Sequence, residues 1–477
     1  MALVVEGVVA NRRSVPAGAV LAVACAATFV SFLDLALVNL AFPQIAADFP
    51  GGISTLTWVV SAYTVAFAAF LAAFGRLADA LGHQKVLLVG VLVVALSSLG
   101  CAIAPTIEWL IAARAVQGIA GAALLPASLG AVLATMPSSK VPAAIGAWSA
   151  AGALAAAIGP AAGAVIVDFW GWRATFVAVA AACVLLGAAV VLWIPAHTSD
   201  PVEDRRSRLP DMLGVALLAV GVGVIVAAVS EAGRWGWSHP VTVMLVFVGV
   251  TALCTVVIRG SMHPRPALEV SLWHWRPFAW ANVISALLGH GLFAYLLAAP
   301  MFLTAIWHLS LMQAAGCVGA AGGLAMIAAG VGGRFITIHN ASWFTGVGLM
   351  LKAAGFAVVA GCFGEQRSFG LWALVAVLLG VGMGLAITAL SVITAAAGGV
   401  DSAASAIGLN LTARSIGGAI GVAVLAAVLT DDHYVLASFH RLFAVLAAVA
   451  ACGAIAAVRL RIPVRDKSVS SFGDFAS

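Results

Sequence analysis

Four charged residues lie inside long apolar stretches of this 477-residue chain: Asp34, Arg114, Lys352 and Arg414. A charge at the centre of an apolar layer is costly, so such residues usually face a protein interior or a water-filled cavity. In a buried carboxylate beside an arginine, desolvation favours the protonated form and the positive charge favours the ionised form. Asp34 is therefore predicted to exchange protons or to form a buried ion pair that never titrates. From the residues alone, Arg114 and Arg414 are equally good partners for it.

One face of the stretch 402–429 carries a repeated set of polar and small residues. Asn410, Arg414, Gly417 and Gly421 follow one another at i, i+4, i+7 and i+11, which places them on one side of an α-helix. Such a face is expected to line a cavity or to contact a neighbouring helix.

Three other polar side chains in apolar stretches are candidates for a role. His290 could carry a second proton or hydrogen-bond a bound molecule, although a structural histidine is the commoner case. Asn39 is a candidate for lining a cavity. Lys352 has a long side chain, so its amino group is expected to snorkel along the helix. The alternative is that the boundaries of its span are off by one turn.

The stretches that hold these residues are predicted membrane spans. The chain is 63% apolar and only 9% charged, with a mean hydropathy of +1.13, whereas soluble proteins are about half apolar and about a quarter charged. A water-soluble enzyme is therefore excluded, and an all-α polytopic membrane protein is predicted. A span needs about 20 apolar residues. Fourteen stretches qualify: 17–41, 56–75, 86–104, 109–131, 143–167, 174–195, 211–229, 240–259, 278–303, 313–334, 342–362, 369–395, 402–429 and 440–460.

The basic residues between these spans are unevenly divided. Of the 23 lysines and arginines, 16 fall on the side shared by both termini and four on the other. Because basic loops stay in the cytoplasm, we expect both termini to be cytoplasmic. The 16 are Arg12, Arg13, Arg76, Lys85, Lys140, Arg205, Arg206, Arg208, Arg259, Arg265, Arg276, Arg334, Arg459, Arg461, Arg465 and Lys467; the four are Arg173, Arg234, Arg367 and Arg441.

The loop after the second span, 75–85, reads GRLADALGHQK. Gly75 and Gly82 permit a tight reversal of the chain. Asp79 is expected to cap the positive end of a neighbouring helix, and Arg76 to pair with a carboxylate.

The fifth span carries Gly152, Gly159, Pro160 and Gly163. The glycine offsets of 7 and 11 residues place all three on one stripe of a helix. Such a stripe lets two helices approach and slide, and Pro160 is expected to add a bend.

These segments resemble, in order, elements of the major facilitator superfamily. The loop at 75–85 is similar to its loop 2–3 signature, RAVQG at 114–118 to its R-x-x-Q-G element, and the Gly-Pro stripe to an element typical of exporters. FLDLALVNLAFP at 32–43 and NLTARSIGG at 410–418 resemble the 14-helix drug:proton antiporters of the EmrB/QacA type. The resemblance makes Arg114 the preferred partner of Asp34, because the family places these two motifs close together.

The resemblance implies two six-helix halves with two extra central helices. The expected division is 1–196 for the N-terminal half, 197–277 for the extra helices and linkers, 278–462 for the C-terminal half and 463–477 for a tail. Gly332, Gly333 and Arg334 follow the tenth span, where the second half would carry its degenerate copy of Gly75 and Arg76.

The implied function is proton-driven export of a small hydrophobic or amphipathic molecule by alternating access, with Asp34 and Arg114 coupling the proton. Asn39, Asn410, Arg414 and His290 are the candidates for contact with the substrate. Alternatives are a metabolite importer of the same fold and an exporter of lipids or siderophores. A membrane-embedded enzyme would need clustered His, Asp or Cys near one interface, and none is found.

No Walker loop is present, so we expect no bound cofactor, with the proton gradient as energy source, and no metal. A monomer in the cytoplasmic membrane of a bacterium is expected.

Overall fold

The computed structural model describes residues 16–49, 53–195, 211–264, 266–268, 270–399, 402–429 and 436–460. Within these ranges the chain forms helices joined by short loops, without a strand. Fourteen of the described helices are long and apolar enough to cross a membrane, which confirms the predicted number of spans. The α-helices are α1 (Ala17–Asp48), α2 (Ile53–Leu81), α3 (His83–Ala102), α4 (Ile107–Thr135), α5 (Val141–Trp170), α6 (Trp172–Trp193), α8 (Met212–Trp235), α9 (Pro240–Met262), α10 (Val270–His274), α11 (Arg276–Ala305), α12 (Leu311–Gly332), α13 (Ala341–Cys362), α14 (Phe369–Gly398), α15 (Ala403–Val428) and α16 (Leu436–Ala456).

Most predicted span boundaries lie within a few residues of the observed helix ends, and four regions differ more. α2 runs on to Leu81 and α8 to Trp235, six residues past their predicted ends. The segment 75–85 is therefore not a loop: Gly75 lies inside α2, and Gly82 alone, with a positive φ, turns the chain into α3. α1 continues past Pro43 to Asp48, whereas the predicted span ends at 41. Contacts with α6 hold this extension: Gln44 accepts a hydrogen bond from the backbone N–H of Trp172, and Asp48 accepts one from its indole. The linker 260–277, expected to be a loop, contains the one-turn helix α10.

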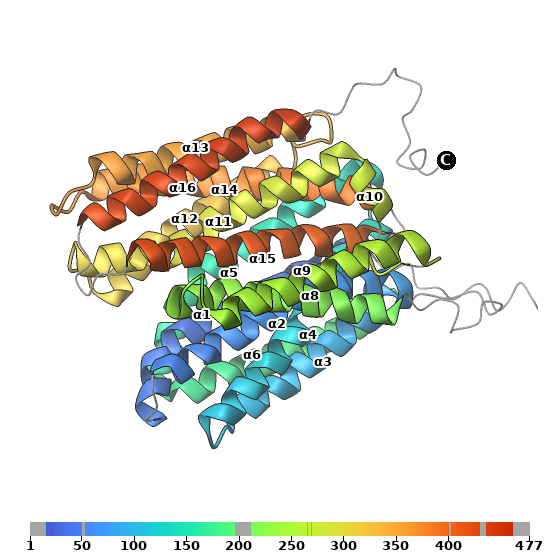
Figure 1. Cartoon of the computed structure of the whole chain (residues 1–477), viewed down its shortest axis with the longest axis horizontal. Coiled ribbons are helices and arrows are strands. Elements are labelled where there is room, and N and C mark those ends of the chain that lie inside the picture. Colours follow the sequence, from blue (N-terminus) through green and yellow to red (C-terminus); the bar gives the residue numbers. More distant parts are fainter. Residues whose placement is uncertain are drawn as a thin grey trace, which may run out of the picture.

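The helices form two bundles that run side by side (Figure 1). Helices α1 to α6 pack together in the N-terminal bundle, and α11 to α16 in the C-terminal bundle. The extra helices α8 and α9 pack on each other, and α8 packs on both α2 and α15. The hairpin therefore contacts a helix of each half.

Two equivalent seams join the halves. In the first, Gly75 of α2 lies so close to α15 that a methyl group there would collide with the carbonyl oxygen of Ala404. In the second, a Cβ on Gly333, at the end of α12, would lie 2.6 Å from the Cα of Gly146 in α5. The expected correspondence between Gly75 and Gly333 is therefore seen in the packing. Gly75 lies within the last two turns of α2, Gly333 directly follows α12, and each packs against the opposite half.

Both seams lie at the end of the bundle that carries the α2–α3 and α12–α13 loops, called here the α2–α3 end. From there the α5–α12 contact runs toward the middle of the bundle, where Cβ atoms on Gly322 and Gly319 would lie about 3 Å from Ala157. The two halves are thus closed against each other at the α2–α3 end.

Candidate functional site

A buried polar cluster joins α1 and α4 in the N-terminal half. Arg114 Nη1 lies 3.0 Å from Asp34 Oδ2, so the two form an ion pair. Gln117 Nε2 donates to Asp34 Oδ1 at 3.0 Å, and Arg114 Nη1 also donates to Gln117 Oε1 at 2.7 Å. The structure thus selects Arg114, of the two arginines the sequence left open, as the partner of Asp34.

Helices α2 and α3 complete this cluster. Ser98 of α3 accepts a hydrogen bond from Gln117, and the carbonyl of Val59 in α2 accepts one from Arg114 Nε. The Arg114 guanidinium lies 4.1 Å from the centre of the Tyr63 ring, a cation–π contact. Gly118 makes this approach possible, because a Cβ there would collide with the Tyr63 backbone.

The cluster is closed to solvent in this conformation. The side chain of Arg114 is fully buried and that of Asp34 is 3% exposed. Desolvation makes such a pair costly to form, yet losing one partner is worse, because the other charge then stays buried and uncompensated. Both carboxylate oxygens of Asp34 therefore have partners here, and any change in its protonation must rearrange Arg114 and Gln117.

The loop motif at the α2–α3 end connects the two halves. Asp79 accepts hydrogen bonds from the backbone N–H groups of Ala404 and Ser405 at 3.1 and 2.7 Å. These are the second and third residues of α15, whose N–H groups have no partner within the helix, so the prediction that Asp79 caps a neighbouring helix is confirmed. Arg76 donates to the carbonyl of Pro266 in the linker before α10.

The glycine stripe of α5 faces α1, within its own half. A Cβ on Gly159 would lie 2.6 Å from the Cβ of Ala36, and one on Gly152 would lie 3.1 Å from the Phe32 ring. Gly163 is buried in the same helix, and α5 passes Pro160 without interruption. The stripe thus brings α5 against the segment of α1 that carries Asp34.

A second buried polar cluster joins α11 and α15 in the C-terminal half. Asn410 Oδ1 accepts hydrogen bonds from Ser285 at 3.0 Å and from Arg414 Nη2 at 3.3 Å. Gly417 and Gly421 let α15 approach α11 closely, so the predicted one-sided face is a helix contact.

Lys352 of α13 belongs to this second cluster. It is 3% exposed, and its Nζ donates to the carbonyl of Leu288 at 2.8 Å. The expectation that Lys352 snorkels along the helix is therefore wrong, because its amino group turns inward to a backbone acceptor. His290 and Tyr295 of α11 are also buried, and His290 Nδ1 and the Tyr295 hydroxyl have no hydrogen-bond partner within the described ranges.

One residue singled out from the sequence lies outside this description. Asn39 belongs to α1, but its side chain is not among the described ones.

The prediction omitted two members of the N-terminal cluster, although each carries a sequence signal. Gln117 follows Arg114 by three positions, which places the two on one face of a helix. Tyr63 is one of only three tyrosines in the chain, and Tyr295, in the other cluster, is the second. By contrast, no local signal identifies Gly146 and Gly333 as seam residues, because their contact depends on pairing between two distant segments.

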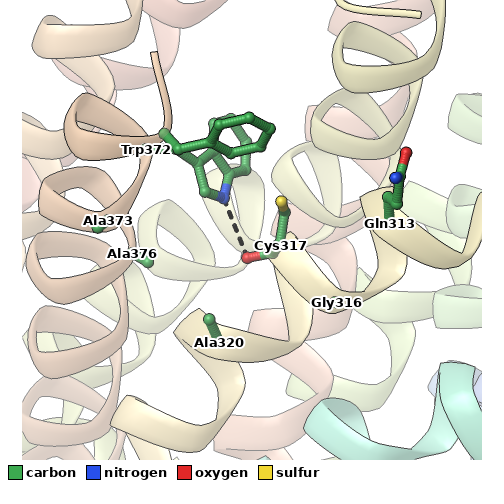
Figure 2. A pocket seen from close by; sticks show the side chains of 8 residues that line it. Gln313, Gly316, Cys317, Ala320, Trp372, Ala373 and Ala376 are labelled. Atoms are coloured by element: carbon green, nitrogen blue, oxygen red, sulfur yellow. Dashed lines mark hydrogen bonds between the residues drawn. The ribbon is translucent and has the colours of Figure 1, made fainter. Parts of the chain in front are cut away.

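An open groove lies between α12 and α14, with a volume of about 420 Å³ (Figure 2). Small residues of both helices line it, and the Trp372 indole donates to the carbonyl of Cys317 at its edge. Gln313 is its only polar side chain apart from that indole and the Cys317 thiol. The groove is therefore wide enough for a small molecule but has few polar groups that could select one.

Two ion pairs lie at the ends of the membrane spans. Hydrogen bonds from Trp172 and Arg173 lower the pKa of Asp48, at the end of α1. A bidentate pair with Arg259 lowers the pKa of Asp211, which precedes α8, to about 2. Across the part of the chain that the structure describes, no three His, Cys, Asp or Glu side chains gather as a metal site would require.

Two packed six-helix bundles are joined by equivalent seams and hold buried charges inside helices long and apolar enough to cross a membrane. These features define the class of a polytopic membrane transporter. The sequence profile of the Major Facilitator Superfamily matches residues 24–422. The chain belongs to the Major Facilitator Superfamily, and it is a transporter of that kind.

Several relatives support this assignment. The chain is 29% identical over 409 residues to the multidrug resistance protein Stp of Mycobacterium tuberculosis (strain CDC 1551 / Oshkosh), over 84% of this chain and 74% of Stp. It is 31% identical over 423 residues to the cephamycin export protein CmcT of Amycolatopsis lactamdurans, over 86% and 84% of the two chains. It is 27% identical over 412 residues to the multidrug export protein EmrB of Escherichia coli K12, over 85% and 78%.

Among solved structures, the human organic anion transporter MFSD10 (TETRAN) superposes with a TM-score of 0.66, over 93% of this chain and 99% of that one. At 16% identity this likeness concerns the fold.

Proposed function

We propose that the chain exports a small hydrophobic or amphipathic molecule across the cytoplasmic membrane of a bacterium in exchange for protons. Relatives named for drug resistance, antibiotic export and multidrug export support this direction and substrate class. The proton gradient drives transport by alternating access, without ATP, a bound cofactor or enzymatic chemistry. The transporter works as a monomer, with both termini in the cytoplasm.

The observation that carries the proposal is the buried ion pair between Asp34 and Arg114. Protonation of Asp34 removes the negative charge that holds the Arg114 guanidinium. The Gln117 amide then faces a carboxylic acid, which carries a hydroxyl, in place of a carboxylate that only accepts hydrogen bonds. A carboxylate that must rearrange its neighbours in order to titrate is suited to coupling a proton to a conformational change.

A path of contacts links this pair to the seam between the halves. α1 carries Asp34 and packs against the glycine stripe of α5. The opposite side of α5 packs on α12, at Gly146 and Ala157. A shift of α1 on protonation therefore reaches the α5–α12 seam through one helix.

The Asp79 cap supplies a contact that must break and reform in each cycle. Its carboxylate, in the N-terminal half, bonds backbone N–H groups of the C-terminal half. When the protein opens at the α2–α3 end, Asp79 has to leave α15. Closure at this end is thus stabilised by a charge at a helix N-terminus as well as by packing.

The Asp34→Asn variant tests the proposal. Efflux of a panel of fluorescent dyes of different charge would be followed in energised vesicles, with and without a protonophore. The amide keeps the size of the side chain but cannot titrate, so proton-driven uphill export should be abolished. Downhill exchange of dye should remain, because it needs no net proton movement.

Asp48→Asn is the matched control, since it makes the same change on the same helix at an exposed ion pair. It should export like the wild type. Full uphill export by a well-inserted Asp34→Asn protein would contradict the proposal. A parallel fall in insertion and exchange would instead assign Asp34 a purely structural role.

A further inference from the structure

Two buried cations of the C-terminal half converge on one turn of α11, residues 288–291. Lys352 reaches it from α13, where its Nζ bonds the carbonyl of Leu288 and would lie 3.1 Å from a Cβ on Gly291. Arg414 reaches the same turn from α15, with its Cγ 3.0 Å from the position of a Cβ on Gly289. Both side chains are at least nine-tenths buried.

No carboxylate balances these charges within the described part of the half. Between 270 and 460 the only described acid is Glu365, which is exposed in the α13–α14 loop. Asp401, Asp431 and Asp432 lie outside the described residues. Uncompensated cations in a protein interior are strongly destabilising, so two of them on the same turn of one helix would be stabilised by a bound anion.

Unsatisfied polar atoms surround the same turn. Arg414 Nε, His290 Nδ1 and the Tyr295 hydroxyl are buried, and none has a hydrogen-bond partner in the described structure. Tyr295 and Lys352, but not Arg414 or His290, line one cavity of about 10 Å³, which is about the space that one water-sized occupant takes. Buried polar groups without partners usually mark a missing water, ion or ligand group.

We propose that this turn is an anion-binding site, in which Lys352 and Arg414 supply the charge and Tyr295 and His290 supply hydrogen bonds. The anion is monovalent, either a chloride-sized inorganic ion or the carboxylate of a transported molecule. Binding of a substrate carboxylate rests on the proposed export function, whereas binding of an inorganic ion does not. With a substrate carboxylate as the ligand, the transporter selects acidic substrates.

The experiment measures anion binding to the purified full-length protein in detergent, without a proton gradient. The probes are radiolabelled chloride and radiolabelled benzoate, in a buffer whose other anion is gluconate. Benzamide serves as the uncharged analogue of benzoate. The variants are Lys352→Met and Arg414→Gln, and Lys140→Met, at an exposed loop lysine, is the matched control.

We expect saturable binding of at least one probe by the wild type and by Lys140→Met, weakened tenfold or more in both cluster variants. Chloride binding that benzoate does not displace identifies an inorganic anion. Benzoate binding that chloride and benzamide do not displace identifies an organic acid as the ligand.

Failure of both probes to bind the wild type would overturn the proposal. So would unchanged binding in Lys352→Met or Arg414→Gln. If one variant does not fold, the other and the wild-type competition still decide the result. Because no transport is measured, a chain without proton-driven export can still bind the anion, and the two proposals can fail separately.

Discussion

The two halves hold similar buried polar clusters that differ in their balance of charge. In the N-terminal half, Asp34 and Arg114 form a neutral pair with Gln117 bridging them. In the C-terminal half, Lys352 and Arg414 share a turn of α11 with no acid beside them in the described structure. The charges of the first cluster balance within the protein, whereas the positive charge of the second would be balanced by a bound anion. The halves have thus kept equivalent packing while their interiors have diverged in chemistry.

The largest expected effect comes from removing one arginine from each cluster. Arg114→Met leaves Asp34 buried without its partner, so we expect a loss of about 3–5 kcal/mol in the free energy of unfolding. Arg414→Met leaves no carboxylate behind and loses only a long hydrogen bond to Asn410, so its loss should be about 1 kcal/mol or less. Denaturant titration of both variants in gluconate buffer measures the difference.

Equal losses of unfolding free energy in the two variants would contradict the difference between the clusters, because both arginines would then have equally strong partners. Combining Arg114→Met with Asp34→Asn sharpens it. The neutral amide needs no cation beside it, so the double variant should recover part of the stability lost in Arg114→Met alone.

An intermediate effect is expected at the seams, where the halves are alike. Leucine at Gly75 or at Gly146 would collide with backbone atoms of the opposite half. Overpacking of this kind costs about 1–3 kcal/mol, which corresponds to a roughly tenfold or larger shift away from the closed state. Export by both variants should fall by a similar factor, while membrane insertion stays normal.

Gly361→Leu is the control for the seam variants, because a Cβ at Gly361 has nothing within 4 Å. Cysteine labelling at the α2–α3 end would follow the opening directly. Loss of export in only one seam variant would show that the two seams are not equivalent.

The smallest effect is expected at Asp211 and Arg259, an ion pair outside both clusters. The pKa of Asp211 is lowered to about 2 from its ordinary value of 3.8 by hydrogen bonds from Arg259. A lowered folded-state pKa stabilises the protein above the ordinary pKa, and this contribution is lost as the pH falls toward 2. Asp211→Asn should therefore cost about 1 kcal/mol at pH 7 and progressively less below pH 4.

Thermal melting at pH 7 and at pH 3 measures this difference between the wild type and Asp211→Asn. A gap that widens in acid would contradict the sign of the pKa shift. Because the pair is peripheral, the same variant should leave export unchanged.

The amino-acid sequence by itself predicted the spans, their number and the motifs. Hydropathy is a local property, since each span has to be apolar wherever it packs, so 14 stretches could be found without knowing their neighbours. Asp34 and Lys352 stood out for the same reason, as charges in apolar surroundings. The cap by Asp79 was also predictable, because a carboxylate close to the turn between two spans can reach the positive end of a neighbouring helix.

Only the tertiary structure decided which residues meet. Asp34 and Arg114 are 80 positions apart, and Arg414 was an equal candidate until α1 and α4 were seen side by side. The inward turn of Lys352 depends on a backbone carbonyl in another helix, which no local pattern encodes. Gly146 and Gly333 became a seam only through the pairing of α5 with α12. Partners are chosen by how helices pack, and packing is a property of pairs of segments that one segment's composition does not contain.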